Sequence, residues 1–291
     1  MERRLLVAIS NDTSALHGVK FITDFFRDFS DLKVTLFASL PARTSYWEEQ
    51  NGFASLADIE EMCAALYSSF EQSMEKAKDL LVQGGMASEN ITTKTEPCRH
   101  STELHLTLEG IVGRYDALVL GRRGLESLSQ LFDDSLTERL FSSEIMLPCW
   151  ACRQFEPGRK NILLCMDRSP VSTALADHLA FILGQDASHT ITLFHVLGSK
   201  EQERDSATQI MNTAAEMLDE RGFSTHRVQV KFAVDSSPSR SILREAQEGR
   251  YALVAIGRKG EIRSGMRSFF LSSTGKTVLR DLTGAALLFG G

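Results

Sequence analysis

The sequence lacks the features that mark several classes of protein. It has no run close to the roughly 18 apolar residues of a membrane-spanning helix, and the segment Met1–Ile9 reaches Asn11 and Asp12 too early for a secretory signal peptide. The 5 cysteines are odd in number and scattered, which argues against a disulfide framework. A net charge of -6 argues against general nucleic-acid binding, because neutralising phosphates requires a basic surface. We therefore expect a cytoplasmic protein with no membrane or nucleic-acid partner.

The composition is that of ordinary globular domains, with 43% hydrophobic and 24% charged residues. A length of 291 residues suggests two domains of about 150 residues each. The charge is unevenly divided: residues 1–156 hold 15 Lys plus Arg against 24 Asp plus Glu, and residues 157–291 hold 17 against 14. If one half of the chain handles an anion, the second half is the better candidate.

An internal repeat organises the chain. The apolar run Leu5–Ser10 matches Ile162–Asp167, and each is followed by a polar turn and a helical pattern of apolar residues. The segment Arg114–Gly124 matches Arg250–Gly260 more closely, with five of eleven positions identical and apolar residues at most of the others. The repeat predicts one domain at residues 1–155 and a second at residues 159–291, joined by a polar linker with Pro and Gly at 154–160.

The first copy carries an insertion. Leu5 and Gly121 are 116 positions apart, whereas Ile162 and Gly257 are 95 apart, and the surplus of 21 residues falls at about 41–62. We expect this segment to form a mobile flap after the second strand, with Trp47 and Phe53 covering the first domain's cleft. Strands and helices alternate elsewhere, which predicts α/β domains with a parallel sheet covered on both faces.

A pair of glycines follows the same strand in each copy. In the second copy Gly257 and Gly260 are followed by basic residues and by the hydroxyl run Ser272–Thr274, which begins a predicted helix. Exposed backbone N–H groups, hydroxyls and a helix N-terminus are a natural environment for phosphate. A second interpretation stays open from the residues alone, in which the glycines only form a tight turn and the basic side chains are a solvated face.

Together these motifs resemble the universal stress proteins, and the resemblance covers both copies. It implies a tandem of two Rossmann-like domains of the adenine nucleotide alpha hydrolase type, each a five-stranded parallel sheet of order 3-2-1-4-5. It also implies that the domains pair through their last strands, at about 145–153 and 284–289, and that ATP or AMP is bound in one branch of the family. Bound Mg²⁺ and a homodimer stay open.

The nucleotide site that the resemblance implies lies in the second domain. Its candidate residues are Asp167, Val196, Gly257, Arg258, Gly260, Ser272, Ser273 and Thr274. The sequence departs from the family pattern in two ways: eleven residues rather than nine separate Gly260 from Ser272, and Ser272 stands where the family has Gly. The first copy is more divergent, with Ser10 in place of the strand-end Asp and Asp134 where a carboxylate would repel phosphate.

Other motifs do not carry a function. The run Thr274–Thr277 lacks the first glycine of a P-loop, because Phe270 stands there. Cys149 and Cys152 have a CxxC spacing but lie in an apolar run that predicts a buried strand. No metal site or nucleophilic triad is evident. We therefore expect a regulatory stress-response module; the alternatives are an interaction protein of the same fold that binds no nucleotide, and a slow ATPase.

Overall fold

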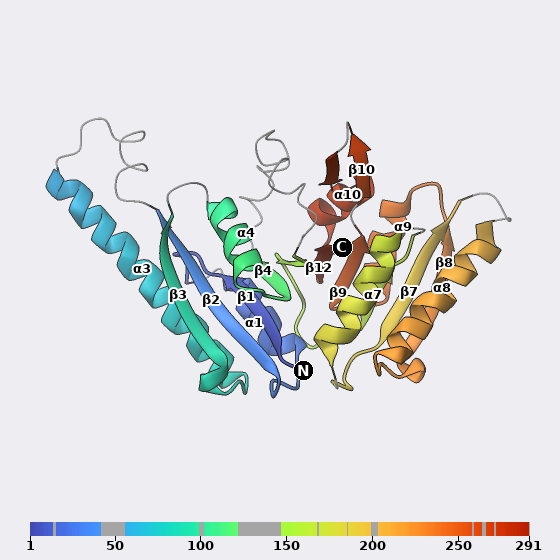
Figure 1. Cartoon of the computed structure of the whole chain (residues 1–291), viewed down its shortest axis with the longest axis horizontal. Helices are drawn as coiled ribbons and strands as arrows, with labels where there is room; N and C mark the ends of the chain where they lie inside the picture. Colours follow the sequence, from blue (N-terminus) through green and yellow to red (C-terminus); the bar gives the residue numbers. More distant parts are fainter. Residues whose placement is uncertain are drawn as a thin grey trace.

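The computed structural model describes residues 1–13, 16–41, 56–98, 102–121, 147–167, 169–184, 186–198, 203–257, 259–263, 266–270 and 272–290. A 10-stranded sheet runs through the molecule in the order β3-β2-β1-β4-β5-β12-β9-β6-β7-β8 (Figure 1). Its strands are β1 (Arg3–Ala8), β2 (Leu32–Pro41), β3 (Ile91–Cys98), β4 (Ala117–Gly121), β5 (Cys149–Cys152), β6 (Ile162–Cys165), β7 (Ile191–Leu197), β8 (Val228–Val234), β9 (Leu253–Gly257) and β12 (Ala286–Gly290).

The sheet consists of two halves with the same topology. Within each half, neighbouring strands are parallel, and the chain order of the strands is 3-2-1-4-5 in both. The halves meet where β5 pairs with β12, the one antiparallel contact in the sheet formed by these strands, with Trp150 opposite Leu288. The α/β fold expected from the repeat is confirmed. We refer to β1–β5 and β6–β12, with their helices, as the first and second repeats.

Helices cover both faces of the sheet, as parallel strands require. The helices are α1 (His17–Phe25), α3 (Leu56–Gln83), α4 (Thr102–Val112), α7 (Pro170–Leu183), α8 (Glu203–Glu220), α9 (Pro238–Glu248) and α10 (Ser273–Asp281). One apolar core lies between the sheet and α1, α3, α7 and α8, and another lies under α4, α9 and α10. Because both faces are covered, β4 and β9 are continuous runs of buried aliphatic residues rather than alternating ones.

The same turn leads into the fourth strand of each repeat. Arg114 and Arg250 both have a positive φ, 53° and 50°, which is uncommon for residues other than glycine. Each follows a glycine at which a Cβ atom would clash with the ring of Tyr115 or Tyr251. The sequence Gly-Arg-Tyr therefore recurs because the turn brings the tyrosine ring against the backbone.

A buried polar network accompanies this turn in both repeats. The Tyr251 hydroxyl donates to Glu245 Oε1 at 3.0 Å, and the other carboxylate oxygen lies 2.6 Å from Lys231 Nζ. In the first repeat Tyr115 donates to Glu109 at 3.2 Å, and Lys94 lies 2.7 Å from the same carboxylate. Both glutamates are buried, at 9% and 6% exposure, so each depends on these partners for its charge.

Aromatic residues fill the junction between the repeats. Trp150 of β5 is fully buried, and its ring contacts those of Phe21, Phe25 and Phe26, with centroids 5.5 to 6.1 Å apart. Aromatic pairs at such distances add to the stabilisation that burial alone provides. The junction is therefore a continuation of the apolar core rather than a contact between two separate surfaces.

Buried polar groups join the two repeats beside this aromatic cluster. The Arg3 guanidinium donates to the backbone oxygens of Ile182 and Leu183, and Asp186 accepts a bond from the Arg27 backbone at 2.8 Å. Burial raises the pKa of Asp186, but hydrogen bonds from Ser188 and Arg27 outweigh it and lower the pKa to about 2. Asp186 is therefore ionised at neutral pH although it is only 4% exposed.

Two expected segments have different bounds in the structure. The last strands are shorter than expected, Cys149–Cys152 and Ala286–Gly290. The expected flap at 41–62 is partly helical, because α3 begins at Leu56; residues 42–55, with Trp47 and Phe53, lie outside the described residues. None of the described helices is long and apolar enough to cross a membrane.

Candidate functional site

The second repeat has its topological switch at β6, which lies between β7 and β9. Connections leave such a strand in opposite directions, which opens a crevice at the carboxyl ends of the strands. Asp167 follows β6 at this point and is exposed. Its Oδ1 accepts bonds from the backbone N–H, at 2.9 Å, and from the hydroxyl of Ser169. Among the described residues, Oδ2 of Asp167 has no hydrogen-bond partner.

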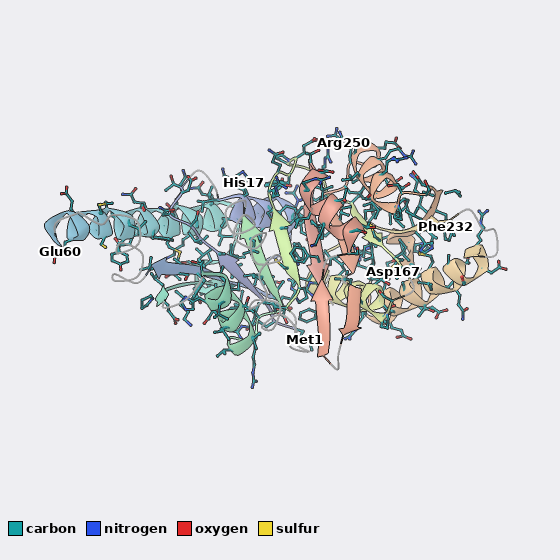
Figure 2. All side chains as sticks on the ribbon, turned by 90° about the horizontal axis from the view of Figure 1, so that it is seen from above. Met1, His17, Glu60, Asp167, Phe232 and Arg250 are labelled. Carbon is teal, nitrogen blue, oxygen red and sulfur yellow. The ribbon has the colours of Figure 1, made fainter. Side chains whose placement is uncertain are left out.

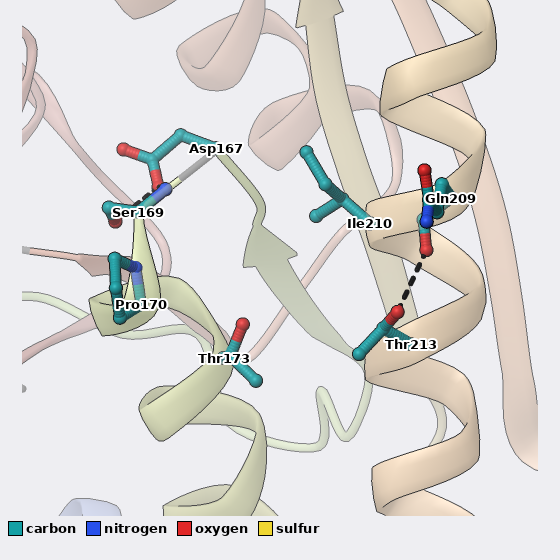
Figure 3. Close-up of a pocket in the computed structure, with 7 residues that line it drawn as sticks. All are labelled: Asp167, Ser169, Pro170, Thr173, Gln209, Ile210 and Thr213. Atoms are coloured by element: carbon teal, nitrogen blue, oxygen red, sulfur yellow. Dashed lines mark hydrogen bonds between the residues drawn. The ribbon is translucent and has the colours of Figure 1, made fainter.

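A groove of about 290 Å³ opens beside Asp167. Figure 3 shows Asp167, Ser169 and Thr173 facing Ile210 and Thr213 of α8 across it. Its lining combines a carboxylate, three hydroxyls, the amide of Gln209 and apolar surface from Pro170 and Ile210. Small ligands bind in concave sites of this kind, where a few convergent polar groups orient an apolar body.

Gly257 ends β9 directly beside the start of α7. A Cβ atom there would lie 3.1 Å from Val171 Cγ1 and 3.4 Å from the Ser172 backbone nitrogen. The absence of a side chain at Gly257 is therefore explained by helix packing. This observation favours the structural interpretation of that glycine over a role in holding phosphate.

The segment after Gly257 differs from the expected open loop. Residues Lys259–Arg263 (β10) and Met266–Phe270 (β11) form an antiparallel hairpin in which Gly260 pairs with Phe269. A glycine in a hairpin ladder has less freedom to wrap a phosphate than one in an open loop.

The hydroxyl run lies at the start of α10, as expected. Ser272 is the N-cap, and its hydroxyl accepts a bond from the Gly275 backbone nitrogen at 3.1 Å. Ser273 and Thr274 are the first residues of the helix, and Ser273 is exposed. A serine at this position is therefore explained by capping, and the positive end of the helix dipole is still available to an anion.

The remaining predicted residues are only partly described. Val196 lies near the end of β7, pairs with Ala233 and is half-buried against the core under α9. Arg258 lies outside the described residues, as do Gly124 and Asp134 of the first repeat. Ser10, the counterpart of Asp167, accepts a 3.4 Å bond from the backbone of Asp12.

The structure also brings together side chains that the sequence did not single out. In the first repeat His105 of α4 lies between Ser39 and Glu96: Ser39 Oγ is 2.9 Å from Nδ1, and Glu96 Oε2 is 3.2 Å from Nε2. Hydrogen bonds from Lys94 and then from His105 lower the pKa of Glu96. The three residues come from different elements, so no local motif indicates them. Ser39 is only 6% exposed, which leaves a substrate little access to its hydroxyl.

The CxxC motif lies in a buried strand, as its apolar surroundings predict. Cys149 and Cys152 lie in β5, where both thiols are buried, and they pack into opposite cores, as expected for residues on opposite faces of a strand. Burial raises the pKa of the Cys152 thiol. Within the described ranges, no group of three His, Cys, Asp or Glu side chains is arranged to hold a metal ion.

Comparison with known proteins agrees with this architecture. Residues 158–288 match the model of the universal stress protein family. The structure resembles a universal stress protein from Archaeoglobus fulgidus DSM 4304, with a TM-score of 0.62 and 14% identity over 98% of this chain and 97% of that chain. It also resembles a functionally unknown protein from Pseudomonas aeruginosa PAO1, with a TM-score of 0.51 and 14% identity over 99% of this chain and 92% of that chain.

At such low identity the structural similarity establishes the fold alone, and the family model identifies the family of the residues that it matches. No curated protein sequence matches the chain. The first repeat has the same strand order as the second and the same Gly-Arg-Tyr turn. Residues 158–288 of this chain belong to the universal stress protein family, and the first repeat shares their fold.

Proposed function

We propose that the second repeat binds an adenine nucleotide, ATP or AMP, and that the protein is a regulatory stress-response module. The main observation behind the proposal is the groove at the carboxyl end of β6. Asp167 lines it together with the hydroxyl-bearing side chains of Ser169, Thr173 and Thr213. A carboxylate accepts hydrogen bonds from ribose hydroxyls or a base amine, and the neighbouring hydroxyls and amide both donate and accept. Apolar surface from Ile210 suits the flat face of a base.

Phosphate would bind toward the start of α10. The backbone N–H groups of Ser273 and Thr274 belong to the first turn of this helix, and such groups favour anions. The second half of the chain also has more Lys and Arg than Asp and Glu, 17 against 14.

Calorimetric titration of the full chain with ATP and AMP tests the proposal. We expect at most one site per chain, with affinity reduced at least tenfold, about 1.4 kcal/mol, in Asp167→Ala. Ser10→Ala is the matched control, because Ser10 occupies the position of Asp167 in the first repeat, and it should leave the affinity unchanged. Two equivalent sites, or equal effects of the two substitutions, would contradict the assignment to the second repeat.

A second candidate function is favoured by the β10–β11 hairpin. Gly260 pairs with Phe269 in that hairpin, and Gly257 is explained by its contact with α7, so the expected glycine cradle has a structural explanation. A protein of this fold that binds other macromolecules and no nucleotide fits these two observations. It predicts that neither ATP nor AMP produces binding heat or raises the melting temperature of the folded chain.

A further inference from the structure

The second repeat ends in an edge strand with exposed apolar side chains. Strand β8 is the last in the sheet, and its sequence Val228–Val234 contains no proline and one charged residue. Val230 is 48% exposed and Val234 is 73% exposed. The labelled Phe232 lies at the end of the molecule far from Glu60 (Figure 2). Edge strands that are apolar and unprotected are ready to pair with another strand.

The other edge of the same sheet is protected. Strand β3 occupies the equivalent position in the first repeat, and the register of each pair aligns Thr93 with Val230 and Pro97 with Val234. Proline cannot donate a ladder hydrogen bond, so Pro97 opposes the addition of a further strand, and the polar Thr93 offers less apolar surface to bury than Val230 does. The difference between the edges therefore lies at the very positions where β8 exposes valine.

We propose that β8 pairs antiparallel with β8 of a second copy of this chain, about a two-fold axis at Phe232. In this register Val230 of each copy lies opposite Val234 of the other, so all four exposed valines enter cross-strand pairs. Lys231 lies opposite Ala233, which avoids placing like charges against each other. The segment Val230–Val234 is thus self-complementary, the property that a two-fold interface requires.

Charges beside β8 fit the same two-fold arrangement. A groove of about 380 Å³ runs between β8 and α9, and Arg244 and Glu248 of α9 help to line it. An axis at Phe232 sets the two α9 helices antiparallel, and each brings charges of opposite sign, Arg244 and Glu248, beside the pairing edge. Lys231 is already paired with Glu245 at 2.6 Å, so it adds no unpaired charge to the contact.

The chain already uses this kind of contact once. Strands β5 and β12, the last of each repeat, join antiparallel and make one sheet of the two halves. Pairing through β8 would extend the same sheet into a second molecule. The groove beside Asp167 would not take part in this contact, because α8 and β7 lie between the groove and the β8 edge. The inference is therefore independent of nucleotide binding.

Sedimentation of the full chain over a range of concentrations tests the pairing. We expect a dimer whose dissociation constant rises at least tenfold in the double variant Val230→Lys with Val234→Lys. The matched control, Thr93→Lys with Thr95→Lys, adds the same charge to the β3 edge and should leave the dimer intact. Circular dichroism spectra and melting temperatures establish that each variant is folded.

Disulfide trapping provides a second measurement that identifies the register. The double variant Val230→Cys with Val234→Cys should form a covalent dimer under mild oxidation, because residue 230 of one copy lies opposite residue 234 of the other. A wild-type chain that stays monomeric at every concentration would overturn the proposal. So would a dimer that survives the lysine substitutions in β8 or one that is lost equally in the β3 control.

Discussion

Tyr251→Phe should expose the energetic role of the buried network that both repeats share. The Tyr251 hydroxyl donates to Glu245 at 3.0 Å, and both side chains are almost fully buried, at 5% and 6% exposure. Removing the hydroxyl leaves one oxygen of a buried carboxylate without its donor. A hydrogen bond to a charged group typically contributes about 1.5 to 3 kcal/mol, and we expect a loss of this size at pH 7.

The pKa of the same hydroxyl predicts how this stability depends on pH. Burial raises the pKa of Tyr251 from 10.0 to about 12. A hydrogen bond with Thr192 opposes this increase in part, and the nearby Glu245 carboxylate adds to it. The neutral hydroxyl is therefore favoured in the folded state. The stability that this raised pKa adds to the folded state is fully present below pH 10 and is lost as the pH rises through 12. A pKa difference of two corresponds to about 2.7 kcal/mol of folding free energy.

Urea unfolding from pH 7 to pH 11, monitored by circular dichroism, measures both effects. The free energy of unfolding of the wild type should fall above pH 10 more steeply than that of Tyr251→Phe, so the two curves converge. Tyr115→Phe, which removes the 3.2 Å bond to Glu109, is the matched variant in the first repeat and should behave alike. Parallel curves for wild type and Tyr251→Phe would refute the reasoning.

Two further predictions concern the buried groups of the junction. The pKa of Asp186 is lowered to about 2 in the folded state, so its contribution is present above the unfolded value of 3.8 and is lost as the pH falls through 2. Asp186→Asn should therefore cost about 1 to 2 kcal/mol at pH 7 and distinctly less at pH 3, measured by urea unfolding; an equal cost at both pH values would contradict this. Cys149 and Cys152, at 3% and 0% exposure, should resist a thiol-reactive aromatic disulfide until urea unfolds the chain, and mass spectrometry of labelled peptides would detect any earlier reaction.

Much of the fold could be predicted because the sequence repeats its strongest local signals. The aliphatic runs at Leu5 and Ile162 and the Gly-Arg-Tyr turns recur with the same spacing to their strands. A run buried on both faces has few alternatives once helices surround it. The ends of the last strands were less predictable from the sequence. Pairing with β4 sets the bounds of β5 at Cys149–Cys152, and pairing with β9 sets those of β12 at Ala286–Gly290. The length of the apolar run does not set them.

The site was predictable only where one residue ends a strand. Asp167 could be placed because it directly follows β6, whereas Gln209 and Thr213 of α8 enter the groove through tertiary packing. The Ser39–His105 contact spans 66 positions and had no local signal at all. The β10–β11 hairpin was not predicted, because the glycine and basic residues of this segment are typical of a loop. Antiparallel pairing between the two strands outweighs that local preference.

Comparison of the two repeats indicates where selection for structure ends and divergence begins. The Tyr–Glu–Lys network is kept in both, because a buried carboxylate that loses a partner costs more than a rim contact. Near the strand ends the repeats differ. The strand registers align Ser39 and Glu96 of the first repeat with Val196 and Ala233 of the second, and His105, four residues before Glu109, corresponds to Ser241, four residues before Glu245. Ser39 and Ser241 are buried and Glu96 is partly exposed, and these side chains differ between the repeats while the strand order of the sheet stays the same. The differences that give each repeat its own function should therefore be sought at the carboxyl rim and at the two edge strands, and not in the core that the repeats share.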